Sequence, residues 1–107
     1  MEKGIRVTKE DLKAMRKHAG DAAAMLRALS HEARLLVLCE LALGERTAGE
    51  LVARSALSQS ALSQHLSILR DEGLVATRRE AQSIFYRIAD DKAARILSVL
   101  HDIYCKR

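Results

Sequence analysis

The sequence contains no proline and few aromatic residues, and each shortage narrows the choice of fold. Proline is absent from all 107 residues and aromatic residues make up 3%, which favours a helical protein over a β-sandwich. No uninterrupted apolar run approaches the roughly 20 residues that a membrane span needs. The first residues, MEKGIRVTKEDLK, also lack the apolar segment of a secretory signal. We therefore expect a cytoplasmic protein with no membrane partner.

The sequence motifs of common enzymes are missing as well. The chain has no C-x-x-C pair and no glycine-rich phosphate loop, and no Ser-His-Asp arrangement stands out. The catalytic alternative is that Cys105 and His101 act as nucleophile and base, or that the two cysteines form a thiol oxidoreductase pair. A turnover assay with a disulfide substrate would reveal it. We expect that the chain is not an enzyme.

The remaining composition is that of one globular domain over residues 1–107. An apolar fraction of 49% in a chain of this length is ample for a single core. The net charge of +4 is compatible with a nucleic-acid partner but does not establish one. The densest basic cluster shares one helical face, for which a solvated surface is a better explanation than phosphate contact. The cluster consists of Lys9, Lys13, Arg16 and Lys17.

Residues 47–88, which we call the reading head, carry the most informative pattern. Thr47 and Glu50 form a T-x-x-E capping box that opens a short helix. Ser58 can cap a second helix, and residues 74–88 have the alternation of two paired strands. A helix, a turn, a helix and a basic hairpin in this order describe a winged helix-turn-helix. The predicted fold is therefore mainly α with a small β-hairpin, and its second helix enters the DNA major groove.

Helices are expected on both sides of the reading head. Apolar residues at helical spacing predict a first helix over about 8–29 and a last helix over about 90–105. Between the first helix and the reading head, Ser30 is expected to cap a helix over 31–43. The segment 35–43 is apolar apart from one glutamate, so we expect it to lie deep in the core.

The second helix of the reading head supports the prediction of DNA binding. Leu62, Leu66 and Leu69 recur at helical spacing and should face inward. Gln and Ser then fill the outer face, where they can hydrogen-bond base edges and phosphates. A solvated face that lacks charge explains this helix equally well, but the arginines of the hairpin favour DNA. His65 borders the apolar face, where packing or capping explains it better than a base contact. The predicted DNA-binding residues are Thr47, Ser58, Gln59, Ser60, Ser63, Gln64, Arg78, Arg79 and Gln82.

A resemblance to a known family rests on two segments, LSHEARLLVLCEL and TAGELVARSALSQSALSQHLSILRDEGLVATRREAQSIFY. Together they resemble the ArsR family of bacterial winged-helix repressors, from about Ala22 to Cys105. Because Cys39 lies in LVLCEL and Cys105 in LHDIYCKR, the chain is similar to the branch that contains HlyU, BigR and SqrR. The resemblance implies a homodimer built on the first and last helices, dimerising through 8–29 and 90–105.

The same resemblance implies what the protein binds and how the binding changes. It implies a transcriptional regulator, and specifically a repressor, that binds double-stranded operator DNA with an imperfect palindrome while its thiols are reduced. It further implies that Cys39 and Cys105 are redox-sensing residues. Their oxidation or persulfidation, by reactive sulfur species or another oxidant as inducer, weakens the binding to DNA.

A metal-responsive repressor of the same family is the main alternative. Metal-sensing members often carry a C-x-C motif in the helix before the turn, but residues 45–51 contain no thiol. The last helix offers acidic residues and His101 without the repeated histidine pair that a tetrahedral zinc site would use. We therefore expect no metal and no other cofactor. A winged helix that only docks other proteins is a less favoured alternative, which would show little salt dependence in its affinity for DNA.

Considered one at a time, the two cysteines have ordinary explanations. Cys39 can be a small apolar residue of the core, and Cys105 can be an incidental thiol at the end of a helix. Only together with the resemblance are they expected to be a functional pair. Their reactivity stays open, because His101, Lys106 and Arg107 favour a Cys105 thiolate, whereas burial and the helix C-terminus disfavour one.

Overall fold

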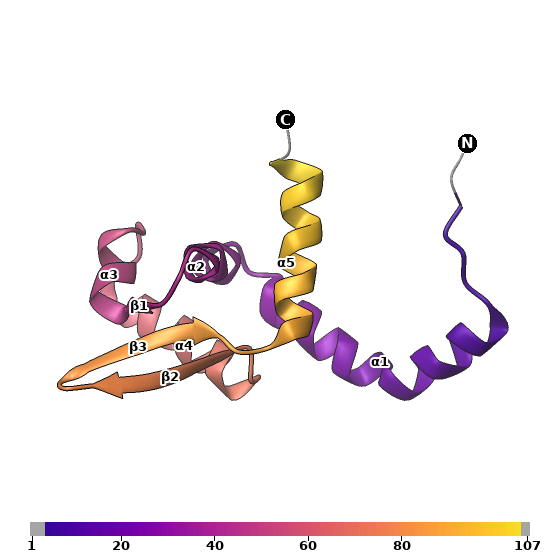
Figure 1. Ribbon diagram of the computed structural model, residues 1–107, viewed down its shortest axis with the longest axis horizontal. Helices are drawn as coiled ribbons and strands as arrows, with labels where there is room; N and C mark the ends of the chain where they lie inside the picture. The colour runs from indigo at the N-terminus through magenta and orange to yellow at the C-terminus, as the bar shows by residue number, and fades with distance from the viewer. Residues whose placement is uncertain (1–3, 106–107) are drawn as a thin grey trace.

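A computed structural model describes residues 4–105 of the chain (Figure 1). Within this range the order of elements is that of a winged helix-turn-helix, which confirms the predicted fold. No helix in this range is both long and apolar enough to cross a membrane. The elements are α1 (Lys9–Leu29), α2 (Glu32–Ala42), β1 (Arg46–Thr47), α3 (Ala48–Ala53), α4 (Gln59–Asp71), β2 (Val75–Glu80), β3 (Ser83–Ile88) and α5 (Asp91–Tyr104).

Leucine side chains form the centre of the molecule. The largest fully buried side chains come from α2, α3, α4 and the residue before β2, so these elements share one core. Since burial of a leucine side chain stabilises a fold by about 1.5–3 kcal/mol, this cluster fixes how α3 and α4 sit on α2. Its members are Leu38, Leu51, Leu62, Leu69 and Leu74.

The start of α4 is fixed by a side-chain cap, as its sequence predicts. The Ser58 hydroxyl accepts a hydrogen bond from the Ala61 backbone N–H at 3.1 Å, which satisfies one of the free amides of the first turn. Leu62, Leu66 and Leu69 are all buried, which confirms the predicted inward face. The cap and the leucine row together define which side of α4 is left in solvent.

The sheet contains a third strand that the sequence analysis does not predict. β1 pairs with β3, and β3 pairs with β2, all antiparallel, in the order β1-β3-β2. A strand of two residues is too short to show alternation, so only its long-range partners, Tyr86 and Phe85, define it. The hairpin turns at Ala81 and Gln82, where Ala81 has a φ of 56°. This left-handed conformation is uncommon for a residue other than glycine.

The cap of α2 corrects the sequence analysis. His31, and not Ser30, is the N-cap: its Nδ1 accepts a hydrogen bond from the Ala33 N–H at 3.1 Å. The Ser30 hydroxyl instead donates to the Arg27 carbonyl oxygen at 2.8 Å. The connection from α1 to α2 is so short that Ser30 ends the first helix and cannot also begin the second.

The burial of α2 also differs from the expectation for residues 35–43. Val37, Leu38 and Leu41 are buried, but Leu36 is 57% exposed and Leu43 is 71% exposed. An apolar run can be buried all round only if neighbours cover every side of the helix. In this chain α2 faces the core with one side, so the prediction that the whole segment lies deep is wrong.

We predict that Leu38→Ala lowers the free energy of unfolding by about 2–5 kcal/mol, because it leaves a cavity in a fully buried site. Leu36→Ala, the same change two residues earlier on α2, should cost less than about 1 kcal/mol because its side chain is already largely hydrated. Chemical denaturation at one fixed protein concentration measures both. Equal losses for the two variants would contradict the packing described here.

Candidate DNA interface and thiol pair

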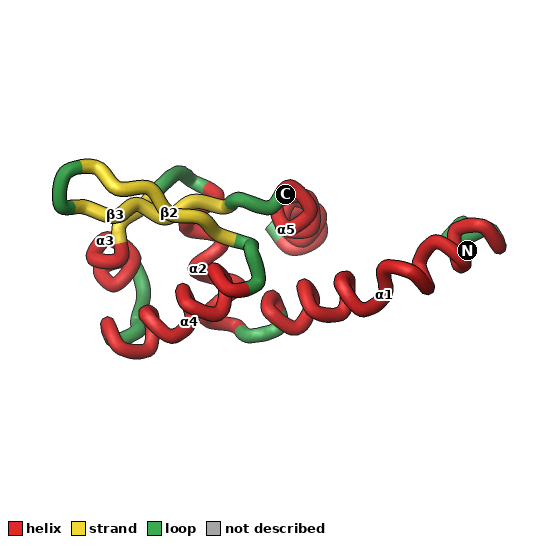
Figure 2. The backbone as a smooth tube through the Cα atoms, turned by 90° about the horizontal axis from the view of Figure 1, so that it is seen from below, coloured by secondary structure: helices red, strands yellow, loops and turns green. Residues whose placement is uncertain are grey.

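The outer face of α4 presents the predicted polar side chains to solvent. Opposite the buried leucines, the exposed positions from 58 to 67 carry hydroxyl and amide groups, and Figure 2 shows α4 along one outer edge of the molecule. Such groups can both donate and accept hydrogen bonds, as base edges require. These exposed residues are Ser58, Gln59, Ser60, Ser63, Gln64 and Ser67.

Two of the predicted DNA-binding hydroxyls already serve as helix caps. Thr47 Oγ1 accepts from the Glu50 N–H at 3.1 Å, while the Glu50 carboxylate accepts from the Thr47 N–H at 2.8 Å. Ser58 has the corresponding role in α4. A hydroxyl that accepts from an amide still has its own hydrogen to donate. Contacts from Thr47 and Ser58 to phosphate therefore stay predictions that are compatible with the caps.

The two arginines of β2 that are predicted to bind DNA have different surroundings. Arg78 Nε donates to the Glu45 carboxylate at 2.8 Å, and Arg78 Nη1 donates to the Glu80 carboxylate at 3.1 Å. The guanidinium also lies 4.5 Å from the centre of the Phe85 ring. The hydrogen bonds that Arg78 donates to Glu45 and Glu80 raise the pKa of its guanidinium. The Arg78 guanidinium is thus already paired with two carboxylates. A DNA phosphate would have to compete with Glu45 and Glu80 for it.

The second arginine, Arg79, is exposed and forms no ion pair with any other residue of the described range 4–105. Gln82 is exposed at the turn of the same hairpin, which extends away from the body of the molecule (Figure 1). Since β2 packs beside α4, the hairpin and the polar face of α4 belong to the same half of the structure. Arg79 and Gln82 therefore fit the predicted wing better than Arg78 does.

His65 packs within the reading head. Its ring centre lies 4.5 Å from that of His31, and its side chain is half-buried between α4 and the start of α2. Burial, and then the charges of His31 and Arg34, lower the pKa of His65. A neutral, packed imidazole agrees with the packing role that the sequence favours.

The two cysteines come from different helices. Cys39 lies on α2, half-buried against the core, and Cys105 is the exposed C-cap of α5; both are free thiols. Burial raises the pKa of Cys39, and the nearby charges of Cys105 and Glu40 raise it further. The Cys39 sulfur also lies 3.4 Å from the imidazole of His101, one helical turn before Cys105, so the fold brings the end of α5 to Cys39. Lys106 and Arg107, expected to favour the Cys105 thiolate, lie outside the described residues.

From the sequence, His101 is expected to act on Cys105, but in the structure its imidazole contacts Cys39. The sequence places it one helical turn before Cys105, and the Cys105 N–H does donate to the His101 carbonyl oxygen at 2.8 Å. The imidazole Nε2, however, lies 3.4 Å from the Cys39 sulfur. A contact between residues so far apart in the sequence leaves no local pattern, so sequence reasoning could not have found it.

No cluster of three His, Cys, Asp or Glu side chains with a geometry suited to a metal ion occurs among residues 4–105. Asp90 instead caps α5, where its Oδ1 accepts from the backbone N–H groups of Lys92 and Ala93 at 2.7 and 3.2 Å. The acidic residue that begins the last helix thus has a structural role.

Comparison with known proteins gives consistent matches along the chain. Residues 31–77 match the family described as "Bacterial regulatory protein, arsR family". The biofilm growth-associated repressor of Agrobacterium fabrum is 48% identical over 98% of this chain and 90% of its own length. The transcriptional activator HlyU of Vibrio cholerae is 45% identical over 90% of this chain and 89% of its own.

Solved structures agree with these matches. The transcriptional repressor BigR of Xylella fastidiosa superposes with a TM-score of 0.83 at 42% identity, covering 94% of this chain and 100% of that one. Reduced HlyU of Vibrio cholerae gives a TM-score of 0.81 at 45% identity, covering 87% and 98% of the two chains. The similarity thus includes the helices outside the reading head.

We predict that Gln64→Ala weakens binding to a DNA duplex selected from random sequences by about 5- to 150-fold. The reason is that a bidentate contact to a base contributes about 1–3 kcal/mol of discrimination. Binding to unselected DNA should stay unchanged, since phosphate contacts carry no sequence information. Fluorescence anisotropy with both duplexes measures the ratio.

A matched change in the hairpin, Arg79→Ala, provides the comparison for Gln64→Ala. It should weaken binding to both duplexes alike and reduce the slope of log affinity against log salt by about 1. If Gln64→Ala leaves the preference for the selected duplex intact, α4 does not read the bases.

Proposed function

The chain belongs to the ArsR family of bacterial regulatory proteins, and we propose that it is a homodimeric repressor that leaves its operator when Cys39 and Cys105 become linked. Its relatives are DNA-binding transcriptional regulators, not enzymes. The observation that carries the thiol part of the proposal is the contact of α2 with α5, where the Cys39 sulfur lies 3.4 Å from Nε2 of His101, one helical turn before Cys105.

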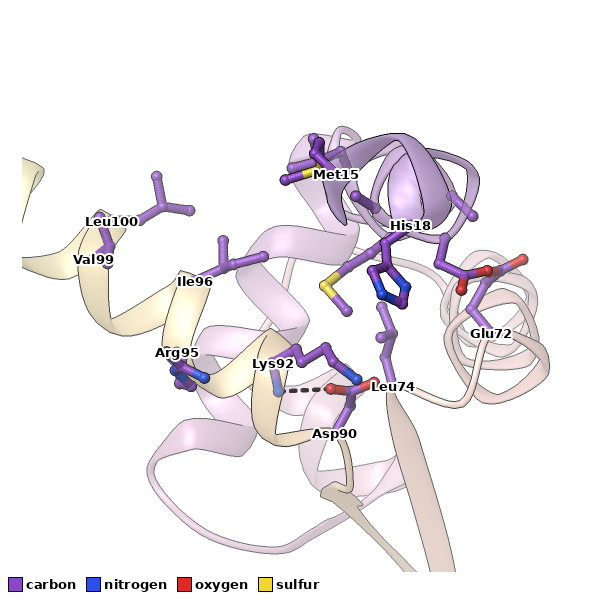
Figure 3. A pocket seen from close by; sticks show the side chains of 15 residues that line it. Met15, His18, Glu72, Leu74, Asp90, Lys92, Arg95, Ile96, Val99 and Leu100 are labelled. Atoms are coloured by element: carbon purple, nitrogen blue, oxygen red, sulfur yellow. Dashed lines mark hydrogen bonds between the residues drawn. The ribbon is translucent and has the colours of Figure 1, made fainter. Parts of the chain in front are cut away.

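An uncovered apolar surface supports the dimer. α1 extends from the rest of the molecule, and most of its residues are exposed (Figures 1 and 2). Between α1 and α5 lies an open hollow of about 930 Å³ with a mainly apolar lining. Figure 3 shows Met15 of α1 on one side and Ile96, Val99 and Leu100 of α5 on another. Apolar patches of this kind mark interaction sites.

A second copy of the chain is the occupant that we propose for this surface. Two-fold pairing would use the same faces of α1 and α5 on both protomers, as the commonest homo-oligomers do. The exposed apolar residues continue beyond the hollow on both helices, so the surface available for pairing is larger than the hollow itself. The exposed apolar residues are Leu12, Met15 and Leu26 on α1, and Val99, Ile103 and Tyr104 on α5, of which Leu12, Ile103 and Tyr104 do not line the hollow.

The dimer determines the form of the DNA target. Two reading helices related by a two-fold axis bind half-sites about 34 Å apart, one turn of the duplex. The operator is then an imperfect palindrome of double-stranded DNA. Because both half-sites must be engaged at once, affinity depends on the distance and orientation between the two protomers.

A link between the thiols acts on that geometry. Cys39 belongs to α2, which packs in the core together with α3 and α4, whereas Cys105 ends α5, one of the proposed dimer helices. A covalent connection would tie the reading head to the dimer helix in a new arrangement. A coupling free energy of about 1–3 kcal/mol, typical of allosteric proteins, lowers affinity by about 5- to 150-fold.

The inducer of the proposed switch is an oxidant or a reactive sulfur species. A direct disulfide requires the two Cα atoms to lie within about 7 Å of each other. A bridge with additional sulfur atoms spans a wider gap. The number of sulfur atoms in the product therefore distinguishes peroxide-type sensing from polysulfide sensing.

We predict that Val99→Glu converts the protein from a dimer to a monomer, because a charge would be buried without a partner in the proposed interface. Operator affinity should then fall by about 10²-fold, since the two reading helices no longer bind together. Ile84→Glu, a matched change at an exposed isoleucine of the hairpin, should leave the dimer intact. Sedimentation velocity compares the two, and a dimeric Val99→Glu protein would exclude this interface.

We predict that Cys39→Ser and Cys105→Ser each abolish the release of DNA by the inducing reagent, because a link needs both sulfur atoms. The reduced variants should bind the operator as the unchanged protein does, since neither residue lies on the polar face of α4. Anisotropy titrations before and after treatment measure this. Release that persists in either single variant would refute the linked-thiol switch.

A further inference from the structure

The Cys39 thiol has a neighbour that the proposed switch does not use. The Nε2 atom of His101, on α5, lies 3.4 Å from the Cys39 sulfur on α2. When Nε2 carries no hydrogen, the imidazole can accept a hydrogen bond from the thiol. The pair is therefore arranged for movement of a proton from sulfur to nitrogen.

The resting state of Cys39 makes such a transfer necessary. Burial, followed by the charges of Cys105 and Glu40, raises the pKa of Cys39. At neutral pH the sulfur keeps its proton, and a protonated thiol is a poor nucleophile. A nearby base that accepts the proton as the new bond forms removes this obstacle. Imidazole suits this role because it ordinarily titrates near neutral pH.

His101 also connects the thiol to an open hollow of about 710 Å³. The hollow lies between the end of α2, the end of β3 and α5, and its charged groups are mostly carboxylates. The negative charge of these groups disfavours the approach of an anionic reagent. The surroundings therefore fit an uncharged organic polysulfide. Besides His101, the titratable and charged groups that line the hollow are Glu45, Arg87, Asp90, Asp91 and Asp102.

We propose that His101 accepts the proton of Cys39 when the Cys39 sulfur attacks an organic polysulfide. With a trisulfide RS–S–SR, a bond forms between Cys39 Sγ and the central sulfur, and the bond from that sulfur to one outer sulfur breaks. The electron pair leaves with the RS group, which then takes the proton from His101.

Cys105 completes the reaction in the unchanged protein. Its sulfur displaces the second RS group, which leaves as RSH. Two thiols and one RS–S–SR thus become a trisulfide link and two RSH molecules, so the cysteines are oxidised and the reagent is reduced. This second step rests on the proposed function, whereas the role of His101 in the first step does not.

The test uses the full chain carrying Cys105→Ser, in which Cys39 is the only thiol. The probe is bis(2-hydroxyethyl) trisulfide, which is uncharged, and intact mass spectrometry follows the Cys39 adduct across about pH 5–9. The rate should rise through the range in which imidazoles titrate. Adding His101→Gln should lower the rate at neutral pH by about 10²-fold and leave only the rise at higher pH that belongs to the thiol.

Two comparisons separate this role from a general effect on structure. Asp102→Asn changes the next residue of the same hollow and should alter the rate by less than about threefold, a small effect beside that of a lost base. In the Cys39→Ser protein, His101→Gln should leave the reaction of Cys105 nearly unchanged. If His101→Gln leaves the Cys39 rate intact, or lowers it without changing the pH profile, His101 is not the proton acceptor.

The experiments distinguish a failure of the proposed linked-thiol switch from a failure of the role proposed for His101. A wild-type protein that forms the link and still binds its operator overturns the proposed function, while the pH profile of Cys39 continues to support the role of His101. A switch that works equally well, at the same rate and pH dependence, with His101→Gln overturns the role of His101 alone.

Discussion

The burial of three leucines on one side of α4 determines which side chains this helix can offer to DNA. Leu62, Leu66 and Leu69 are packed in the core, and Ser58 fixes where the helix begins. Because side chains of a helix repeat every 3.6 residues, the serine and glutamine side chains between these leucines face solvent. The face of α4 that we propose to bind DNA is thus a consequence of core packing, and a loss of packing would also disturb the geometry of that face.

The same core connects the reading head to the thiols. α2 contributes Leu38 to the centre of the cluster and Cys39 to its margin, so a chemical change at Cys39 occurs on a helix whose position is tightly fixed. α5 carries both His101 and Cys105 and the apolar side chains that we assign to the dimer. A link across α2 and α5 would therefore act between two units, the reading head and the dimer helices, with little freedom to absorb it elsewhere.

Local sequence signals predicted most of the fold. Capping patterns at Thr47 and Ser58, and leucines at helical spacing, depend on residues within one or two turns, and the structure confirms them. The contacts that the sequence did not predict are long-range: the strand β1, the pairing of Glu45 with Arg78, and the position of the His101 ring at Cys39. These depend on how distant segments pack, for which one sequence carries no periodic signal.

Intact mass and operator binding, measured on the same samples, test whether linkage of Cys39 to Cys105 releases DNA. The reduced protein and samples treated separately with peroxide, an organic disulfide and an organic polysulfide are divided, and both quantities are measured on each. We expect that DNA is lost only in samples where Cys39 and Cys105 are linked, with extra sulfur in the link after polysulfide. Complete linkage with DNA still bound, or release of DNA with both thiols unmodified, would contradict it.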